Sequence, residues 1–152
     1  LSDFGNCISL EKKTFHIQTR YYRAPEIILE YDFDEKCDIW SVGCMIYELL
    51  TGDVLFDPKK ERRLCTDRAH LYQMIILFGK IPEELINKSK RKIEFFKKNG
   101  LLKSIYEIDL NNTNLLNLSE SAIKLLQQIF NYDPKERPSA KSLLSHPWLD
   151  RH

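Results

Sequence analysis

The chain has no apolar run near the roughly 20 residues that a helix needs to cross a bilayer. Residues 1–5 (LSDFG) lack the basic start and apolar core of a secretory signal, and a first residue other than Met favours the interior of a longer protein. The 23 Lys and Arg nearly cancel the 22 Asp and Glu, which gives a formal net charge of +1. Bulk charge therefore gives no reason to expect a membrane or nucleic acid as a direct partner.

Cysteine and histidine are few, and their spacing does not suggest a metal site. Cys7, Cys37, Cys44 and Cys65 form no CxxC pair, and the four histidines do not supply short ligand spacing. Scattered cysteines of this kind favour reduced thiols in an intracellular protein, cytoplasmic, nuclear or both. Internal repeats and low-complexity tracts are also missing.

Strand signals are poor and helical signals dominate, so we expect a mainly α fold. Apolar residues cover nearly every face of 34–50, which is typical of a helix buried on all sides, and Gly52 suits its left-handed C-cap. Pro25 should open a short helical turn, and Asp67 could cap a helix that stops near Gly79. Further helices are expected after Ser119 and over about 139–144, with a long loop over 6–23 and short helical pieces between 82 and 114.

Four short motifs stand in a fixed order along the chain. They are Asp3–Gly5 (DFG), Ala24–Glu26 (APE), Asp38–Gly43 (DIWSVG), and Asp133-Pro134 with Arg137-Pro138. The first motif alone is weak, but the order and spacing of all four are those of a protein kinase. Over its whole length the chain resembles the C-terminal helical lobe of a eukaryotic protein kinase catalytic domain, and this implies a mainly α, incomplete kinase fold.

Within the kinases, the segment Thr19–Glu26 (TRYYRAPE) resembles the CMGC group. Three stretches are most similar to the SR-protein kinases: Ile17–Arg20, Thr51–Pro58 and Phe95–Lys103. Residues 82–114 then correspond to the CMGC insert.

The resemblance implies an ATP-dependent serine/threonine kinase and assigns roles near the start of the chain. Asp3 would be the catalytic carboxylate that binds Mg²⁺, and through it ATP, because Mg²⁺ prefers oxygen ligands. Phe4 would act as a hydrophobic switch for Asp3, and Gly5 would give the backbone the necessary freedom. Thr19 resembles the threonine that contacts the catalytic aspartate and fixes Ser/Thr chemistry.

Further roles fall on the activation segment and on its supports. Arg23 resembles the arginine that shapes the pocket for the residue after the phosphoacceptor, although a solvated loop charge is the alternative. Thr14 stands where many CMGC kinases carry an activating phosphothreonine, or it is an unmodified loop residue. Glu26 and Arg137 should form a buried pair rather than two unrelated surface charges. Asp38 should bind the backbone of the catalytic loop; it also suits the N-terminus of a helix, where the dipole favours an acid, and the two roles are compatible.

Several kinase features are missing from the sequence: the glycine-rich loop, the ATP-binding lysine, the αC glutamate and the H-R-D catalytic loop. We expect them upstream of Leu1. Residues 1–152 would then be a partial catalytic domain, inactive alone, whose partners are the remainder of that domain and a Ser/Thr protein substrate. The alternative is a pseudokinase or scaffold lobe that binds protein partners without catalysis.

Charge departs from the SR-protein kinase pattern, which includes an acidic docking surface for arginine-rich peptides. Residues 83–103 carry seven Lys or Arg and three Glu, a net charge of +4, and 59–63 read KKERR. Because like charges repel, this face should disfavour an arginine-rich substrate. A solvated basic surface with no docking role is the alternative.

Overall fold

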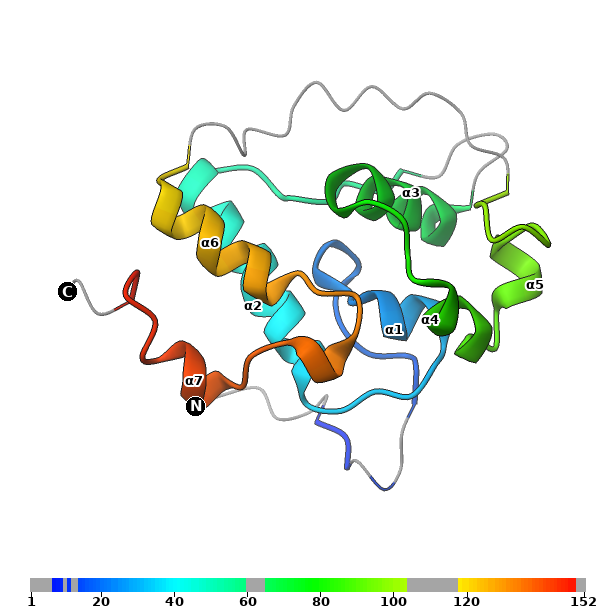
Figure 1. The fold of residues 1–152 in the computed structure, drawn as a ribbon, viewed down its shortest axis with the longest axis horizontal. Coiled ribbons are helices and arrows are strands. Elements are labelled where there is room, and N and C mark those ends of the chain that lie inside the picture. The colour runs from blue at the N-terminus through cyan, green and yellow to red at the C-terminus, as the bar shows by residue number, and fades with distance from the viewer. Residues whose placement is uncertain (1–6, 10, 12–13, 60–64, 104–117, 150–152) are drawn as a thin grey trace.

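A computed structural model describes residues 7–9, 11, 14–59, 65–103 and 118–149 (Figure 1). Its helices are α1 Pro25–Leu29, α2 Lys36–Thr51, α3 Thr66–Phe78, α4 Glu83–Lys88, α5 Lys92–Phe95, α6 Glu120–Ile129 and α7 Ala140–Leu143, with 3-10 turns η2 Arg20–Tyr22 and η4 Pro134–Glu136. The described ranges hold no strand beyond one isolated antiparallel bridge, Phe96 to Leu102. The expected mainly α fold is therefore confirmed.

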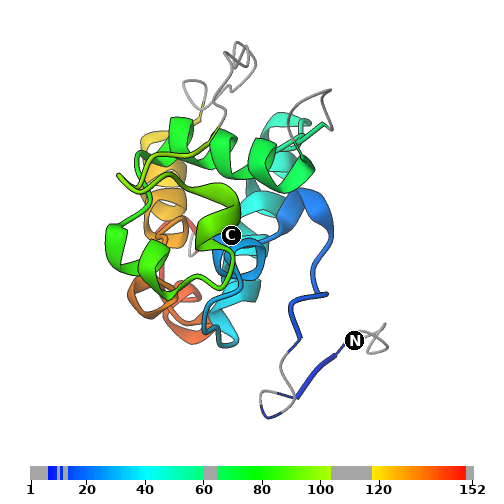
Figure 2. The same cartoon turned by 90° about the vertical axis from the view of Figure 1, so that its right-hand side faces the viewer.

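Helix α2 is the hub of the fold, and α6 packs along it (Figures 1 and 2). The fully buried indole of Trp40 lies 6.2 Å from the ring of Phe56 and 5.0 Å from that of Phe130, measured between centroids. A Cβ on Gly43 would lie 2.5 Å from Cγ2 of Ile129, so only glycine allows the two helices to approach this closely. The buried residues of α2 are Cys37, Ile39, Trp40, Gly43, Cys44 and Tyr47.

Apolar residues on every face predict a helix that needs neighbours on all sides, and in the described ranges the second half of α2 lacks some of them. Met45, Leu49 and Leu50 expose 44%, 85% and 43% of their surface. The elements that pack most extensively on α2 in the described ranges are η2, α6 and η4, and these side chains remain open to solvent. An apolar patch thus lies along the C-terminal half of the central helix.

Local signals placed most helix ends correctly. Pro25 begins α1, Gly52 ends α2 at a φ of +82°, and the Ser119 hydroxyl caps α6 by accepting a hydrogen bond from the backbone N–H of Ala122 at 3.3 Å. The Asp67 cap is wrong, because α3 begins at Thr66 and the Asp67 carboxylate binds arginines instead. No helix in the described part of the chain is long and apolar enough to cross a membrane.

Candidate functional site

A buried ion pair joins α1 to the turn η4. Nη1 and Nη2 of Arg137 donate to Oε1 and Oε2 of Glu26 at 2.5 and 2.7 Å, and both side chains have no exposed surface. The two residues are 111 positions apart in the sequence. The expected contact between Glu26 and Arg137 is therefore present.

The remaining donors of Arg137 are also satisfied. Nε donates to the carbonyl of Asn131 at 2.7 Å, and Nη1 donates to the carbonyl of Lys36 at 3.1 Å. The guanidinium lies 5.0 Å from the centre of the Trp40 ring. Burial raises the pKa of Glu26, although the hydrogen bonds from Arg137 oppose the rise. One arginine thus fixes α1, the start of α2 and η4 together.

Gln18 anchors the segment before α1 to the first turns of α2. Its Nε2 donates to the carbonyl of Cys37 at 2.9 Å and to Oγ of Ser41 at 3.1 Å, while its Oε1 accepts from the N–H of Ala24 at 2.9 Å. Its φ of +65° is left-handed, which is uncommon for a residue other than glycine. Sequence reasoning missed this role, since no local pattern marks a glutamine for it.

The left-handed turn at Gln18 brings its carbonyl to Arg23. Nη2 of Arg23 donates to that oxygen at 2.9 Å, while Nε is buried and has no hydrogen-bond partner among the described residues. Burial, followed by the neighbouring Arg20, lowers the pKa of Arg23. Arg23 is therefore a fixed part of the segment rather than a solvated loop charge.

Asp67 joins η2 to the segment after α4. Its carboxylate accepts from Nη1 of Arg20 and from Nη1 of Arg91, the second at 2.8 Å. Arg91 also donates to both carboxylate oxygens of Glu94, at 2.8 and 2.7 Å. Burial favours a higher pKa for Asp67, but the two arginines outweigh it and lower the pKa. These contacts tie η2, α3 and α5 together, and the sequence analysis did not foresee them.

A cavity of about 460 Å³ opens between the segment around Thr19 and the start of α2. Thr19 and Asp38 both line it and both are exposed; Asp38 lies in the first turn of α2. The structure thus brings together two of the residues that the sequence marks for catalysis and for binding the catalytic loop. Ser41, also on the wall, donates its hydroxyl to the carbonyl of Tyr22 at 2.9 Å.

None of the remaining predicted residues that the structure describes lines this cavity, although Arg23 donates to the carbonyl of Gln18 on its wall. Asp3, Phe4 and Gly5 lie outside the described residues. Thr14 is half-buried, and its hydroxyl accepts from the backbone N–H of His16 at 3.2 Å. In the described ranges, no three His, Cys, Asp or Glu side chains come close enough to hold a metal ion.

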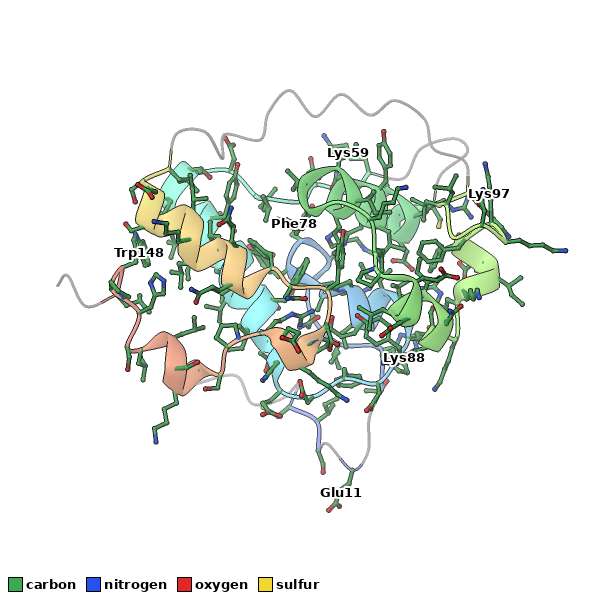
Figure 3. All side chains as sticks on the ribbon, in the orientation of Figure 1. Glu11, Lys59, Phe78, Lys88, Lys97 and Trp148 are labelled. Atoms are coloured by element: carbon green, nitrogen blue, oxygen red, sulfur yellow. The ribbon has the colours of Figure 1, made fainter. Side chains whose placement is uncertain are left out.

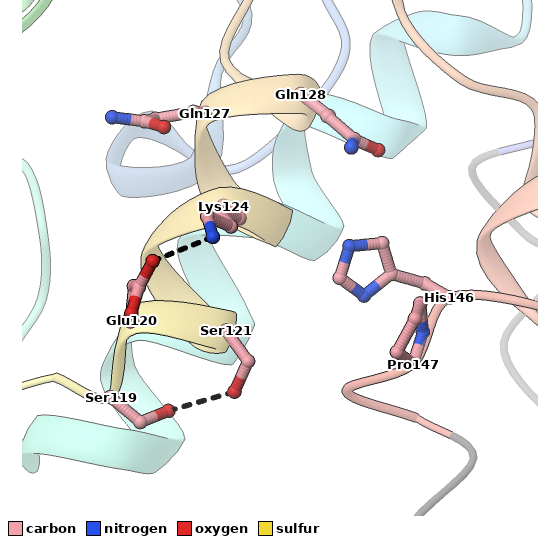
Figure 4. A pocket seen from close by; sticks show the side chains of 8 residues that line it. All are labelled: Ser119, Glu120, Ser121, Lys124, Gln127, Gln128, His146 and Pro147. Atoms are coloured by element: carbon pink, nitrogen blue, oxygen red, sulfur yellow. Dashed lines mark hydrogen bonds and ion pairs between the residues drawn. The ribbon is translucent and has the colours of Figure 1, made fainter.

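A wider cavity of about 910 Å³ lies between α6 and the segment after α7 (Figure 4). Lys124 and Gln128 of α6 face His146 and Pro147 across it, and Lys124 pairs with Glu120 at 2.6 Å. None of the residues predicted for function lines this cavity. We therefore centre the candidate site on the cavity at Thr19 and Asp38.

The profile of the protein kinase domain matches residues 1–149, so the chain belongs to the protein kinase family. A protein of Acanthamoeba polyphaga mimivirus named as serine/threonine-protein kinase L205 is 43% identical over 99% of this chain and 30% of its own length. SKY1 of Saccharomyces cerevisiae is 36% identical over 98% of this chain and 21% of its own. SRSF protein kinase 3 of Homo sapiens is 33% identical over 99% and 28%. Within the family the chain is thus similar to SR-protein kinases, as the sequence predicts, and it spans less than a third of each of these three relatives.

Proposed function

We propose that this chain forms the C-terminal helical part of an ATP-dependent protein serine/threonine kinase. The observation that carries the proposal is the double anchoring of residues 18–26. Gln18 fastens one end of this segment to α2, and Glu26 fastens the other end to Arg137. This double anchoring holds Thr19 on the wall of the cavity and Arg23 against the turn at Gln18. We propose that a substrate is positioned there.

The proposed chemistry is phosphoryl transfer from ATP to a serine or threonine hydroxyl. We propose that Asp3 would hold Mg²⁺, whose charge would neutralise the phosphates of ATP, the donor of the phosphoryl group. Thr19 would position the catalytic aspartate, and Asp38 would accept hydrogen bonds from the backbone of the catalytic loop within the cavity of about 460 Å³. Both residues are exposed there and accessible to such partners.

The contact between Arg23 and Gln18 supports a preference at the residue after the phosphoacceptor. The Gln18 carbonyl is already engaged by Arg23, so it is a poor acceptor for a substrate N–H. A proline at that position has no N–H to leave unpaired. We therefore propose that the kinase tolerates proline directly after the serine or threonine.

The catalytic residues missing from residues 1–152 would lie upstream, and the chain alone would be inactive. The named relatives are serine/threonine-protein kinases, so they lend no support to a scaffold without catalysis. We also propose that the protein acts inside the cell, in the cytoplasm, the nucleus or both.

The test is phosphate transfer by the full-length protein to serine and threonine peptides, with the products located by mass spectrometry. Asp3→Asn should lower kcat at least about 100-fold, because the metal loses a charged ligand. Asp53→Asn, at an exposed position just after α2, is the matched control and should leave kcat unchanged. Full activity of the Asp3→Asn protein would refute the assigned metal role, and no transfer by the parent protein would refute the proposed function.

A further inference from the structure

A short hairpin follows α5 and is held in one conformation. The backbone N–H of Lys97 donates to the carbonyl of Leu101 at 2.8 Å, and Gly100 turns the chain at a φ of +75°. Phe96 and Leu102 pair across the hairpin and are buried, exposing 4% and 2%. Because the buried pair fixes the hairpin to the core, the side chains between them are presented at fixed positions.

The outer side of this hairpin and of α5 forms what we call the lysine face. We define it by Lys92, Ile93, Lys97, Lys98, Leu101 and Lys103. Nζ of Lys92 donates to Oδ1 of Asn87 at 2.5 Å and Nζ of Lys103 donates to the carbonyl of Ile93, so the ammonium groups without a partner among the described residues are those of Lys97 and Lys98. Ile93 exposes 85% of its surface and Leu101 exposes 41%. Lys97 and Lys98 are exposed, and Lys97 points away from the body of the molecule in Figure 3. Two aliphatic side chains thus stand in solvent among cationic groups.

Nothing in the described part of the chain neutralises this face. The nearby carboxylate of Glu94 is engaged on both oxygens by Arg91. No ion pair in the described ranges involves Lys97, Lys98 or Lys103. Residues 83–103 have a net charge of +4, and counting Glu107 and Asp109 as well still leaves +2. The field at the face is therefore positive.

We propose that the lysine face docks an acidic segment of a protein partner, whose carboxylates pair with the lysines and whose aliphatic side chains cover Ile93 and Leu101. Complementary charge steers and orients such a segment, and burial of the aliphatic groups adds affinity. A fixed hairpin reduces the entropy cost of binding on the side of the kinase. The partner is thus opposite in charge to an arginine-serine repeat.

Other classes of partner fit the face less well. Single-stranded nucleic acid is bound by stacking bases on exposed aromatic rings, whereas Phe95 and Phe96 expose only 0% and 4%. A membrane surface calls for a broad apolar face, and here only Ile93 and Leu101 are available.

The test measures binding of a fluorescent peptide rich in glutamate and leucine to the full-length protein, by anisotropy and without ATP, so that it does not depend on kinase activity. Lys97→Glu with Lys98→Glu should weaken binding at least about tenfold and flatten its salt dependence. Ile93→Ser should weaken binding about three- to fivefold with the salt dependence unchanged.

Lys135→Glu with Lys141→Glu is the matched control, since it makes the same charge change at exposed positions on η4 and α7 (Figure 1). It should leave binding within about twofold, because charges beyond a Debye length are screened. An equal loss in both double variants would overturn the proposal, as would binding of an arginine-serine peptide as tight as that of the acidic one. Single-stranded RNA or phosphatidylserine vesicles that displace the peptide from the lysine face would also overturn it.

Discussion

Arg137 donates two hydrogen bonds to Glu26 in a site from which water is excluded, although 111 positions separate the two residues. Replacing Arg137 by Ala leaves the Glu26 carboxylate buried without a partner. The free energy of unfolding should therefore fall by about 3–5 kcal/mol. Urea unfolding of the full catalytic domain, followed by circular dichroism, measures the change.

Lys135→Ala provides the control, because Lys135 is exposed in the same turn, η4. Its effect should stay within about 0.5 kcal/mol. A combined Glu26→Leu and Arg137→Met variant should recover part of the lost stability, because no unpaired charge remains. Equal effects of Arg137→Ala and Lys135→Ala would show that the pair adds nothing to stability.

Arg23 should govern the preference at the residue after the phosphoacceptor. In Arg23→Ala the Gln18 carbonyl loses its donor and can accept the N–H of a residue other than proline. We compare kcat/KM for a peptide with proline at that position with kcat/KM for the same peptide with alanine there. The proline-to-alanine ratio should fall about tenfold, which corresponds to the net free energy of about one hydrogen bond. Assays of paired peptides with the full-length protein measure this ratio.

Arg68→Ala, on α3, is the comparison for general effects of losing an arginine. It should leave the proline-to-alanine ratio unchanged even if the rates for both peptides fall. A constant ratio in Arg23→Ala would remove Arg23 from substrate selection.

His70 should make the fold sensitive to acid. It is fully buried against Phe56, with ring centroids 4.8 Å apart, and neither ring nitrogen has a hydrogen-bond partner among the described residues. Burial lowers the pKa of His70 to about 3. An unfolded chain takes up this proton below its ordinary pKa of about 6.5 and the folded one does not, so stability is lost as pH falls from about 6.5 towards 3.

In the full catalytic domain, His70→Leu should be near neutral at about pH 7 and should retain about 2–3 kcal/mol more stability than the parent at about pH 4.5. His70→Gln, also uncharged, should flatten the pH profile similarly but be less stable, because its amide stays unpaired. Denaturant unfolding across the pH range gives the comparison. If the parent and the His70→Leu protein lost the same amount of stability as pH falls, the prediction would be wrong.

The features that could be predicted from the sequence alone are those that depend on residues close together along the chain. Gly52, Ser119 and Pro25 act on their own helix ends, and the structure confirms all three. The ion pair between Glu26 and Arg137 joins residues far apart in the sequence, and it could be predicted only from the resemblance to protein kinases.

The misses have a common cause, which is that a distant partner decides the outcome. Asp67 has the side chain of a helix cap, but Arg20 and Arg91 bind it more strongly than a backbone N–H would. The anchoring role of Gln18 depends on Cys37 and Ser41, which lie 19 and 23 positions away in the sequence. None of these partners is encoded near the residue itself.

The exposed patch on α2 gives a prediction that separates residues 1–152 alone from the full-length protein. Met45 and Leu49 stand in solvent, and exposed apolar patches promote aggregation. We expect the chain alone to aggregate and to show no micromolar affinity for Mg-ATP, and we expect Leu49→Lys to reduce its aggregation in light scattering.

In the full-length protein we expect upstream residues to cover this patch. There Leu49→Lys should instead lower the free energy of unfolding by about 2–5 kcal/mol, because it would bury a charge. Leu144→Lys, at a position 74% exposed at the C-terminal end of α7, should leave the aggregation of the chain alone unchanged. It should also change the free energy of unfolding of the full-length protein by less than about 0.5 kcal/mol. A full-length protein that tolerates Leu49→Lys as well as Leu144→Lys would show that α2 keeps an open apolar face in the whole kinase.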